Sequence, residues 1–227
     1  MTRRVKDDGR TTRWDAHRDQ RRIELVEAAV RAIDMHGPDA SVADIAAEAG
    51  ISKPVIYRYF ADKAELHSAV GQWGADLVLE KLLPVIVTPG PVRDRVASAC
   101  DAYLGVLEEH PQVFLLLVRH RTDGSDPLAD GKVAIAAMLA RAIGDSLRAQ
   151  DVDAAGAEPW AHGLVGLGLA TGEWWLTRQT MSREAVARYL TEFVWHAFSG
   201  VSREYGFPVR PPRKATVTPI AERRAPQ

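Results

Sequence analysis

The chain has 227 residues, of which 46% are apolar and 26% charged. This composition is typical of a soluble globular protein and excludes a disordered chain. The 29 Lys and Arg residues balance 30 Asp and Glu residues, a net charge of −1, which excludes nucleic-acid binding by overall charge and leaves only a local basic face. One cysteine, Cys100, excludes a disulfide framework and a multi-cysteine metal site. Because the sequence also lacks a signal-peptide core and an apolar run near the roughly 20 residues of a membrane span, we expect a cytoplasmic protein without a membrane partner.

Residues 1–22 are rich in arginine and nearly free of aliphatic side chains. They hold eight Arg and Lys residues and four Asp residues. This composition predicts a flexible basic arm whose end merges into a helix. The arm is either a solvated tail or a segment that reaches DNA phosphates or a minor groove, and the sequence leaves both interpretations open.

The next part of the chain alternates short helical patterns with stop signals. From Ile23 the apolar residues recur at three- and four-residue spacing until Gly37-Pro38. Ser41, with Asp44 three residues later, indicates a capping box for a short helix that Gly50 ends. We expect helices at 23–36, 41–49, 52–59 and 61–82.

Four Pro and Gly residues at 84–91 mark a seam, after which the helical patterns are longer. No segment alternates apolar and polar residues as a half-buried strand does. The predicted fold class is therefore all-α. We expect the later helices at 92–109, 111–120, 127–150, 157–178 and 183–201.

Residues 41–60, SVADIAAEAGISKPVIYRYF, predict a helix-turn-helix. Gly50 suits the left-handed conformation of the tight turn, and the alanines before it let the two helices approach closely. The second helix presents basic and tyrosine side chains, which donate to phosphates and guanine edges in a major groove. The alternative is that Tyr57, Tyr59 and Phe60 only pack the small domain, which we accept for Phe60 and in part for Tyr59.

The stretch DIAAEAGISKPVIYRYFADKAEL resembles the DNA-binding region of the TetR family of transcriptional regulators. The shared pattern is an Ala-Gly turn, Ser-Lys, aliphatic-Tyr, aromatic-Phe and a Lys at the start of the next helix. The resemblance implies three small DNA-binding helices, a linking fourth helix, and further helices that bind an inducer and form a dimer. By position it implies DNA contacts from Ser41, Ser52, Lys53, Pro54, Val55, Tyr57, Arg58, Tyr59 and Lys63.

These patterns divide the chain into four predicted segments. They are a flexible basic arm at 1–22, a helix-turn-helix DNA-binding domain at 23–66, a helical ligand-binding and dimerisation domain at 67–205, and a loose Pro/Arg-rich tail at 206–227. Residues 1–66 hold 12 basic and 12 acidic residues, so DNA binding must depend on how the charges are placed. Two copies of the domain about 34–36 Å apart read a palindromic operator, which makes a homodimer part of the hypothesis.

The last two predicted helices carry the dimerisation prediction. The resemblance implies that they pair with their symmetry mates as a four-helix bundle, and the alternative is that they only line the monomer core. Small residues are frequent in the first of them, at Gly163, Gly166, Gly168, Ala170 and Gly172. Small side chains allow close approach to another helix or to a ligand.

Large apolar residues of the C-terminal part are candidates for a ligand cavity. They are Tyr103, Leu107, Phe114, Leu117, Trp160, Leu164, Trp174 and Trp175. An apolar pocket with few charges suits a hydrophobic or amphipathic small-molecule effector. The stretch GLVGLGLATGEWWL also resembles the acyl-CoA-responsive members that control lipid genes in actinobacteria, which implies a long-chain acyl-CoA as the effector.

Catalytic, cofactor and metal motifs are missing from the sequence. We find no Ser-His-Asp context, no HExxH motif and no Walker loop, and we assign no catalytic residue, cofactor or metal. The sequence therefore predicts a ligand-responsive transcriptional regulator, specifically a repressor released from DNA by its effector. Two alternatives remain: an enzyme with unrecognised catalysis, and a helical ligand-sequestering protein with a degenerate helix-turn-helix.

Overall fold

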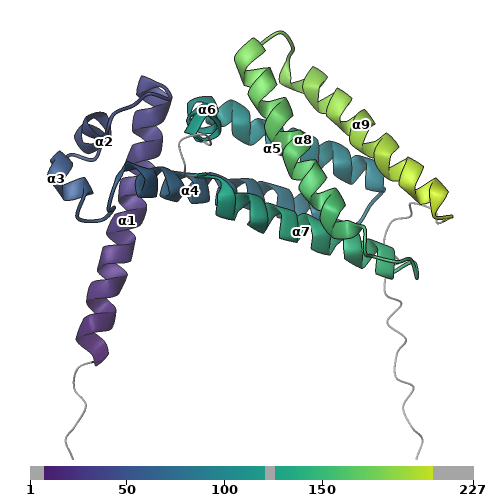
Figure 1. Cartoon of the computed structure of the whole chain (residues 1–227), viewed down its shortest axis with the longest axis horizontal. Helices are drawn as coiled ribbons and strands as arrows, with labels where there is room; N and C mark the ends of the chain where they lie inside the picture. Colours follow the sequence, from purple (N-terminus) through teal and green to yellow (C-terminus); the bar gives the residue numbers. More distant parts are fainter. Residues whose placement is uncertain (1–7, 121–125, 207–227) are drawn as a thin grey trace, which may run out of the picture.

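The computed structural model describes residues 8–120 and 126–206. All regular structure in these ranges is helical, which confirms the predicted all-α fold class (Figure 1). The predicted tail at 206–227 lies outside the described residues except for Gly206. The helices are α1 (Asp8–His36), α2 (Val42–Glu48), α3 (Lys53–Ile56), α4 (Lys63–Val87), α5 (Val92–Glu109), α6 (Pro111–Arg119), α7 (Ala129–Arg148), α8 (Ala157–Arg178) and α9 (Arg183–Glu204).

Helix α1 begins much earlier than its apolar pattern predicts. Residues 8–22 form a helix rather than the predicted arm, and residues 1–7 lie outside the described range. Polar residues give no amphipathic signal, yet Arg and Gln have good helix propensities. Arg21 also pairs with Glu24, one turn later, at 2.6 Å. The helix therefore continues beyond the part that packs on the core.

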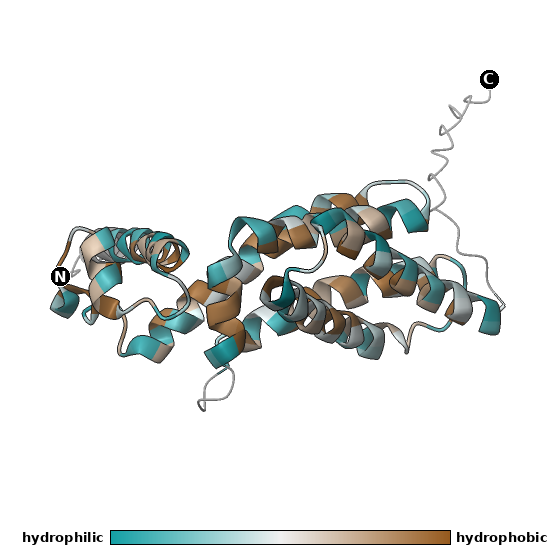
Figure 2. Cartoon of the chain, turned by 90° about the horizontal axis from the view of Figure 1, so that it is seen from above, coloured by the Kyte–Doolittle hydropathy of each residue, from teal (hydrophilic) through white to brown (hydrophobic). Residues whose placement is uncertain are grey.

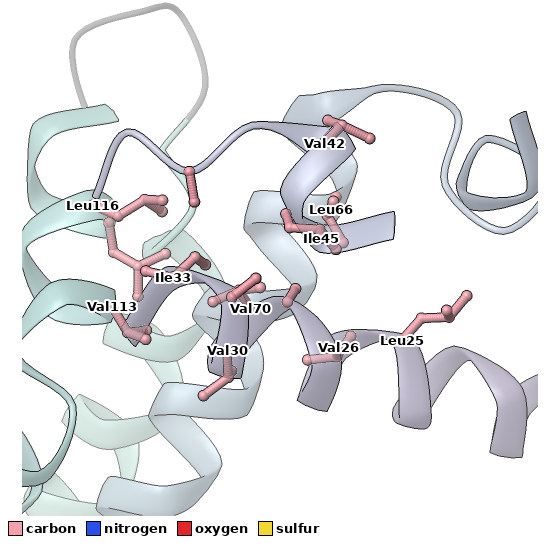
Figure 3. Packing of buried hydrophobic residues seen from close by; sticks show 14 of the residues in the cluster. Leu25, Val26, Val30, Ile33, Val42, Ile45, Leu66, Val70, Val113 and Leu116 are labelled. Carbon is pink, nitrogen blue, oxygen red and sulfur yellow. The ribbon is translucent and has the colours of Figure 1, made fainter. Parts of the chain in front are cut away.

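The N-terminal lobe consists of α1, α2, α3 and the first turns of α4. Its centre is filled by fully buried side chains, among them Ile33, Ile45 and Phe60. Figure 3 shows side chains of α1, α2 and α4 meeting in this core. The turn between α2 and α3 passes through Gly50 at φ +65°, the left-handed conformation that the sequence predicts.

The core of the N-terminal lobe continues into α6. Val113 and Leu116 of α6 lie beside Ile33 of α1 (Figure 3). Leu117 and Leu128 belong to the same buried cluster. The two halves of the chain therefore share one apolar contact surface, in addition to the covalent link through α4.

The C-terminal lobe consists of the rest of α4 and of α5–α9. In it α8 packs on α7, α9 packs on α5, and α4 contacts both α5 and α7. Seen from above, the C-terminal lobe is the larger of the two lobes (Figure 2). No described helix combines the length and apolarity that a membrane span requires.

Candidate DNA-binding surface and ligand cavity

The first half of the helix-turn-helix is fixed by a capping box. The Ser41 hydroxyl accepts a hydrogen bond from the Asp44 backbone N–H at 3.2 Å, and the Asp44 carboxylate accepts one from the Ser41 backbone N–H at 2.8 Å. The bonds from Ser41 hold the pKa of the Asp44 carboxyl below its ordinary value. The predicted capping box is thus confirmed, and Ser41 lies exposed where α2 begins.

The second short helix ends sooner than the sequence predicts. α3 is helical only from Lys53 to Ile56, and residues 57–59 form a turn. The backbone N–H of Phe60 still donates to the carbonyl of Ile56 at 3.1 Å. Ile56 and Phe60 are both buried, so they anchor this turn to the core. The prediction of a helix through Tyr59 is therefore wrong in its second half.

Most of the predicted DNA-contacting side chains are free of the core. The exposed ones are Ser41, Ser52, Lys53, Pro54, Tyr57, Arg58 and Lys63. Val55 and Tyr59 are half-buried, and Tyr59 packs against the core of the N-terminal lobe. Two basic side chains and a tyrosine on consecutive turns thus form an outward surface made of Lys53, Tyr57 and Arg58.

Arg22 holds this surface in place, a role that sequence reasoning missed. Its Nη1 donates to the carbonyl of Tyr59, its Nη2 donates to Glu65 at 2.7 Å, and its guanidinium lies 4.3 Å from the ring centroid of Phe60. The backbone N–H of Ala61 and then Arg22 lower the pKa of the Glu65 carboxyl. These partners are far from Arg22 in the sequence, so no local pattern could reveal them.

The C-terminal lobe contains an apolar cavity of about 320 Å³. Six of the predicted ligand residues line it: Tyr103, Leu107, Phe114, Leu117, Trp160 and Leu164. On α8, a Cβ atom added to Gly172 would lie 2.5 Å from Leu107 Cδ2. The glycine therefore lets α8 approach α5 closely beside the cavity.

Trp174 and Trp175 do not line the cavity, contrary to the prediction. The last α8 residues at the cavity are Leu167, Gly168 and Leu169, more than a helical turn before Trp174. Trp174 is 43% exposed, whereas Trp175 is buried among side chains of α5 and α9 and donates from Nε1 to the carbonyl of Met181 at 3.0 Å. Neighbouring positions on a helix point about 100° apart. The composition of the segment alone did not show which face of α8 lines the cavity.

Tyr103 and His110 are two of the polar side chains that line the cavity. Tyr103 lies at its middle, and His110 lies in the wall nearest the N-terminal lobe. Tyr103 has a buried hydroxyl without a hydrogen-bond partner, and burial raises the pKa of Tyr103, which keeps the phenol neutral. His110 Nδ1 is hydrogen-bonded to Asp34 of α1 at 2.7 Å, and its ring meets that of Trp73 edge-on at 5.0 Å. His110 and Trp73 both line the cavity, so the wall contacts α1 directly.

Comparison with known families identifies both halves of the chain. Residues 25–70 match the family model of bacterial regulatory proteins of the tetR family. Residues 81–209, more than half of the chain, match the model of the tetracyclin repressor-like C-terminal domain. The chain belongs to the TetR family of transcriptional regulators. It is thus a DNA-binding protein of a family of transcription regulators, not of enzymes.

Several proteins resemble this TetR regulator along most of their length. The uncharacterised HTH-type transcriptional regulator Rv0472c of Mycobacterium tuberculosis is 32% identical, covering 87% of this chain and 85% of its own. The HTH-type transcriptional activator FasR of Mycolicibacterium smegmatis is 28% identical, covering 81% and 85%. The crystal structure of FadR from Bacillus subtilis in complex with stearoyl-CoA has a TM-score of 0.62 at 16% identity, covering 75% and 95%, and therefore shares the fold.

The outer face of α8 and α9 carries small and aromatic residues. Gly163, Gly166 and Ala170 of α8 are exposed, and a Cβ atom added to either glycine would meet nothing within 4 Å. On α9, Tyr189 is 53% and Phe193 65% exposed. In this TetR regulator the last two helices thus each expose small or aromatic residues to solvent.

The described ranges contain no cluster of metal ligands and no reactive thiol. No group of three or more potential metal ligands comes together there. Burial raises the pKa of the Cys100 thiol, which keeps it protonated and weakly reactive. Cys100 packs beside the buried cluster of α5, α8 and α9, as a structural thiol does.

Proposed function

We propose that this TetR regulator is a homodimeric repressor that binds a palindromic operator and is released by a hydrophobic small molecule. The observation that carries the proposal is the exposed set of Lys53, Tyr57 and Arg58 on a turn anchored by buried Ile56 and Phe60. Ser41, Ser52, Pro54 and Lys63 flank this set and are exposed as well. Lysine and arginine suit guanine edges and phosphates, and the tyrosine hydroxyl suits phosphates.

A dimer is required because one surface of this size makes few contacts with DNA. The exposed face of α8 and α9 is the natural dimer interface, since its small residues admit close packing and its aromatic side chains gain from burial. Two recognition surfaces held about 34–36 Å apart then fit successive major grooves on one side of the duplex. The operator is therefore expected to be a palindrome.

The effector site is the cavity of the C-terminal lobe. Its lining is apolar over most of its length, with Leu107, Phe114 and Leu164 among the side chains, which suits a long apolar chain. The similarity in fold to FadR, which was crystallised with stearoyl-CoA, makes a long-chain acyl-CoA the candidate that we test first.

Release is transmitted through the wall that the two lobes share. Val113, Leu117 and Leu128 line the cavity and also belong to the core of the N-terminal lobe. The His110–Asp34 hydrogen bond adds a polar contact between the same wall and α1. An effector that prefers one arrangement of this wall shifts the spacing of the two recognition surfaces, and a dimer with the wrong spacing loses one half-site.

A gel shift tests the proposal. The full-length protein with the DNA upstream of its own gene should give sequence-specific retardation that weakens steeply with salt. A long-chain acyl-CoA should raise the melting temperature of the protein and reduce this retardation. No specific retardation would favour a ligand-sequestering protein with a degenerate helix-turn-helix.

The sign of regulation needs a separate measurement, because FasR, a relative at 28% identity, is named an activator. A promoter fused to a reporter should give more transcript when the gene for this regulator is deleted. Less transcript in the deletion strain would show activation instead.

A further inference from the structure

The two ends of the cavity differ in how their basic side chains are paired. At the near end, beside the N-terminal lobe, His110 is hydrogen-bonded to Asp34 and Lys132 forms an ion pair with Asp126. At the far end the basic residue is Arg95 of α5, which lines the cavity. In the described part of the chain no carboxylate forms an ion pair with Arg95, whose Nη1 donates only to the carbonyl of Ile86 at 3.1 Å.

Unpartnered polar atoms gather at this far end. The Nε of Arg95 is buried and has no hydrogen-bond partner. On α7, the Gln150 Nε2 donates to the carbonyl of Ser146 at 2.9 Å, which leaves the buried Gln150 Oε1 without a partner. Ser146 and Gln150 line the same cavity. The far end therefore has a positive charge without a carboxylate partner and a free acceptor, whereas His110 and Lys132 at the near end are both paired.

The order of the helices places this charge at the end of a long apolar channel. α4 and α7 contact each other and run in the same direction (Figure 1), so their C-terminal ends lie at the same end of the lobe, where α5 begins after α4. Trp73 lines the near end and Ile86 the far end. These positions are 13 residues apart on one helix, which corresponds to about 20 Å at 1.5 Å per residue.

An unpaired guanidinium in a half-buried wall is unfavourable until an anion pairs with it. Guanidinium also offers a planar set of donors that matches carboxylate and phosphate. We infer that the effector is an amphiphile whose apolar chain fills the channel and whose anionic head group binds Arg95. This inference rests on the proposed function, because it assumes that the cavity is the effector site.

Binding measured without DNA tests the inference on the full-length protein. Isothermal titration compares palmitate, palmitoyl-CoA and the neutral methyl palmitate, each below its micelle-forming concentration. We expect at least one anionic chain to bind roughly tenfold or more tightly than the ester, because hydrogen bonds to charged groups are stronger than neutral ones. Preference for palmitate identifies a carboxylate as the head group, and preference for palmitoyl-CoA identifies the phosphates of the nucleotide.

Variants assign the preference to Arg95. Arg95→Gln should lose the tenfold advantage of the anionic chain and leave ester binding unchanged, while Arg95→Lys should keep part of it. Arg93→Gln is the matched control, because Arg93 is exposed on the same helix and does not line the cavity. Unchanged binding of the anion by Arg95→Gln would overturn the inference.

The wild-type protein alone provides a second test that does not depend on any variant folding. Equal affinity for ester and anion, or no binding of either anionic chain, would also overturn the inference. Failure of operator binding in a gel shift would refute the proposed function instead, and because titration uses no DNA, the two failures are distinguishable.

Discussion

The side chains proposed to contact DNA lie outside the core of the N-terminal lobe, whereas those proposed to contact a ligand lie inside the core of the C-terminal lobe. In the N-terminal lobe, Lys53 and Tyr57 lie outside a core that Ile45 and Phe60 fill. In the C-terminal lobe, the side chains that we propose to contact a ligand line a cavity inside the core. A substitution on the outer surface of the N-terminal lobe should therefore alter DNA binding without altering stability. A substitution around the cavity should alter both DNA binding and stability.

Part of the cavity wall belongs to both lobes. Leu117 and Val113 are buried in the N-terminal core and also line the cavity. The core of the N-terminal lobe thus shares side chains with the wall of the cavity that we propose as the effector site. We propose that through this shared wall a ligand bound in the cavity alters DNA binding.

The largest effect is expected on the outer surface of the N-terminal lobe. Lys53→Ala should weaken specific operator binding at least about 100-fold, because a charged hydrogen bond contributes about 1.5–3 kcal/mol and a dimer loses it twice. Tyr57→Ala should behave in the same way. Gel shifts measure affinity, and an unchanged melting temperature shows that the core is intact. Lys81→Ala, an exposed lysine on α4, is the control, and unchanged operator affinity in Lys53→Ala and Tyr57→Ala would refute the assigned surface.

The outer face of the C-terminal lobe should be essential for assembly. Phe193→Glu places a charge at the proposed dimer interface and should convert the dimer to monomers that bind the operator only weakly, because a buried unpaired charge is strongly unfavourable. Light scattering after gel filtration measures the mass. Met35→Glu changes a side chain that is 68% exposed on α1 and should leave the dimer intact. A dimeric Phe193→Glu protein would exclude this interface.

Two glycines on α4 should respond differently to substitution by alanine, because only one of them is in close contact with another segment. A Cβ atom added to Gly71 would lie 2.0 Å from the Pro127 carbonyl oxygen, whereas one added to Gly74 would lie 3.9 Å from Leu117 Cδ1. Gly71→Ala should lower the free energy of unfolding by about 1–3 kcal/mol through overpacking. Gly74→Ala should be neutral or stabilise by up to about 1 kcal/mol. Urea unfolding measures both, and equal effects would contradict the close contact.

His67, where the lobes meet, should make stability depend on pH. Burial, and then the charges of His120 and Lys63, lower the pKa of His67 from 6.5 to about 4. The unfolded chain therefore binds more protons between these values, so stability is complete above pH 6.5 and falls as the pH drops toward 4. The loss attributable to His67 should be roughly 3 kcal/mol, since each pKa unit corresponds to about 1.4 kcal/mol.

Thermal melts from pH 7 to pH 4.5 check this expectation. His67→Leu should flatten the fall in stability over that range, since it removes the group that gains a proton on unfolding. His17→Leu, at an exposed position on α1, should leave the pH dependence as it is. An identical slope in His67→Leu and the wild-type protein would show that other groups cause it.

The smallest expected effect concerns communication between the lobes. Asp34→Ala removes the hydrogen bond to His110 and should reduce the effector-induced change in operator affinity by roughly 0.5–2 kcal/mol. Operator affinity is measured with and without the effector. Glu27→Ala is the control, because Glu27 is exposed on the same helix. Full effector response in Asp34→Ala would place the coupling entirely in the apolar wall.

The parts of the molecule that depend on neighbouring residues could be predicted from the sequence. The Ser41–Asp44 capping box, the turn at Gly50 and the buried position of Phe60 were all predicted, and the structure has each of them. Caps, positive φ angles and helical spacing involve residues within about one turn of each other, so their signals are local. The TetR family itself was recognisable because its pattern lies in one such continuous stretch.

Contacts between distant segments were decided only by the tertiary structure. Arg22 looked like part of a basic arm, yet it joins α1 to Tyr59 and Glu65. Trp174 and Trp175 looked equivalent, but only the second is buried. The missing partner of Arg95 could not be predicted at all, because whether a charge is paired depends on how helices pack rather than on which residues stand beside it in the chain.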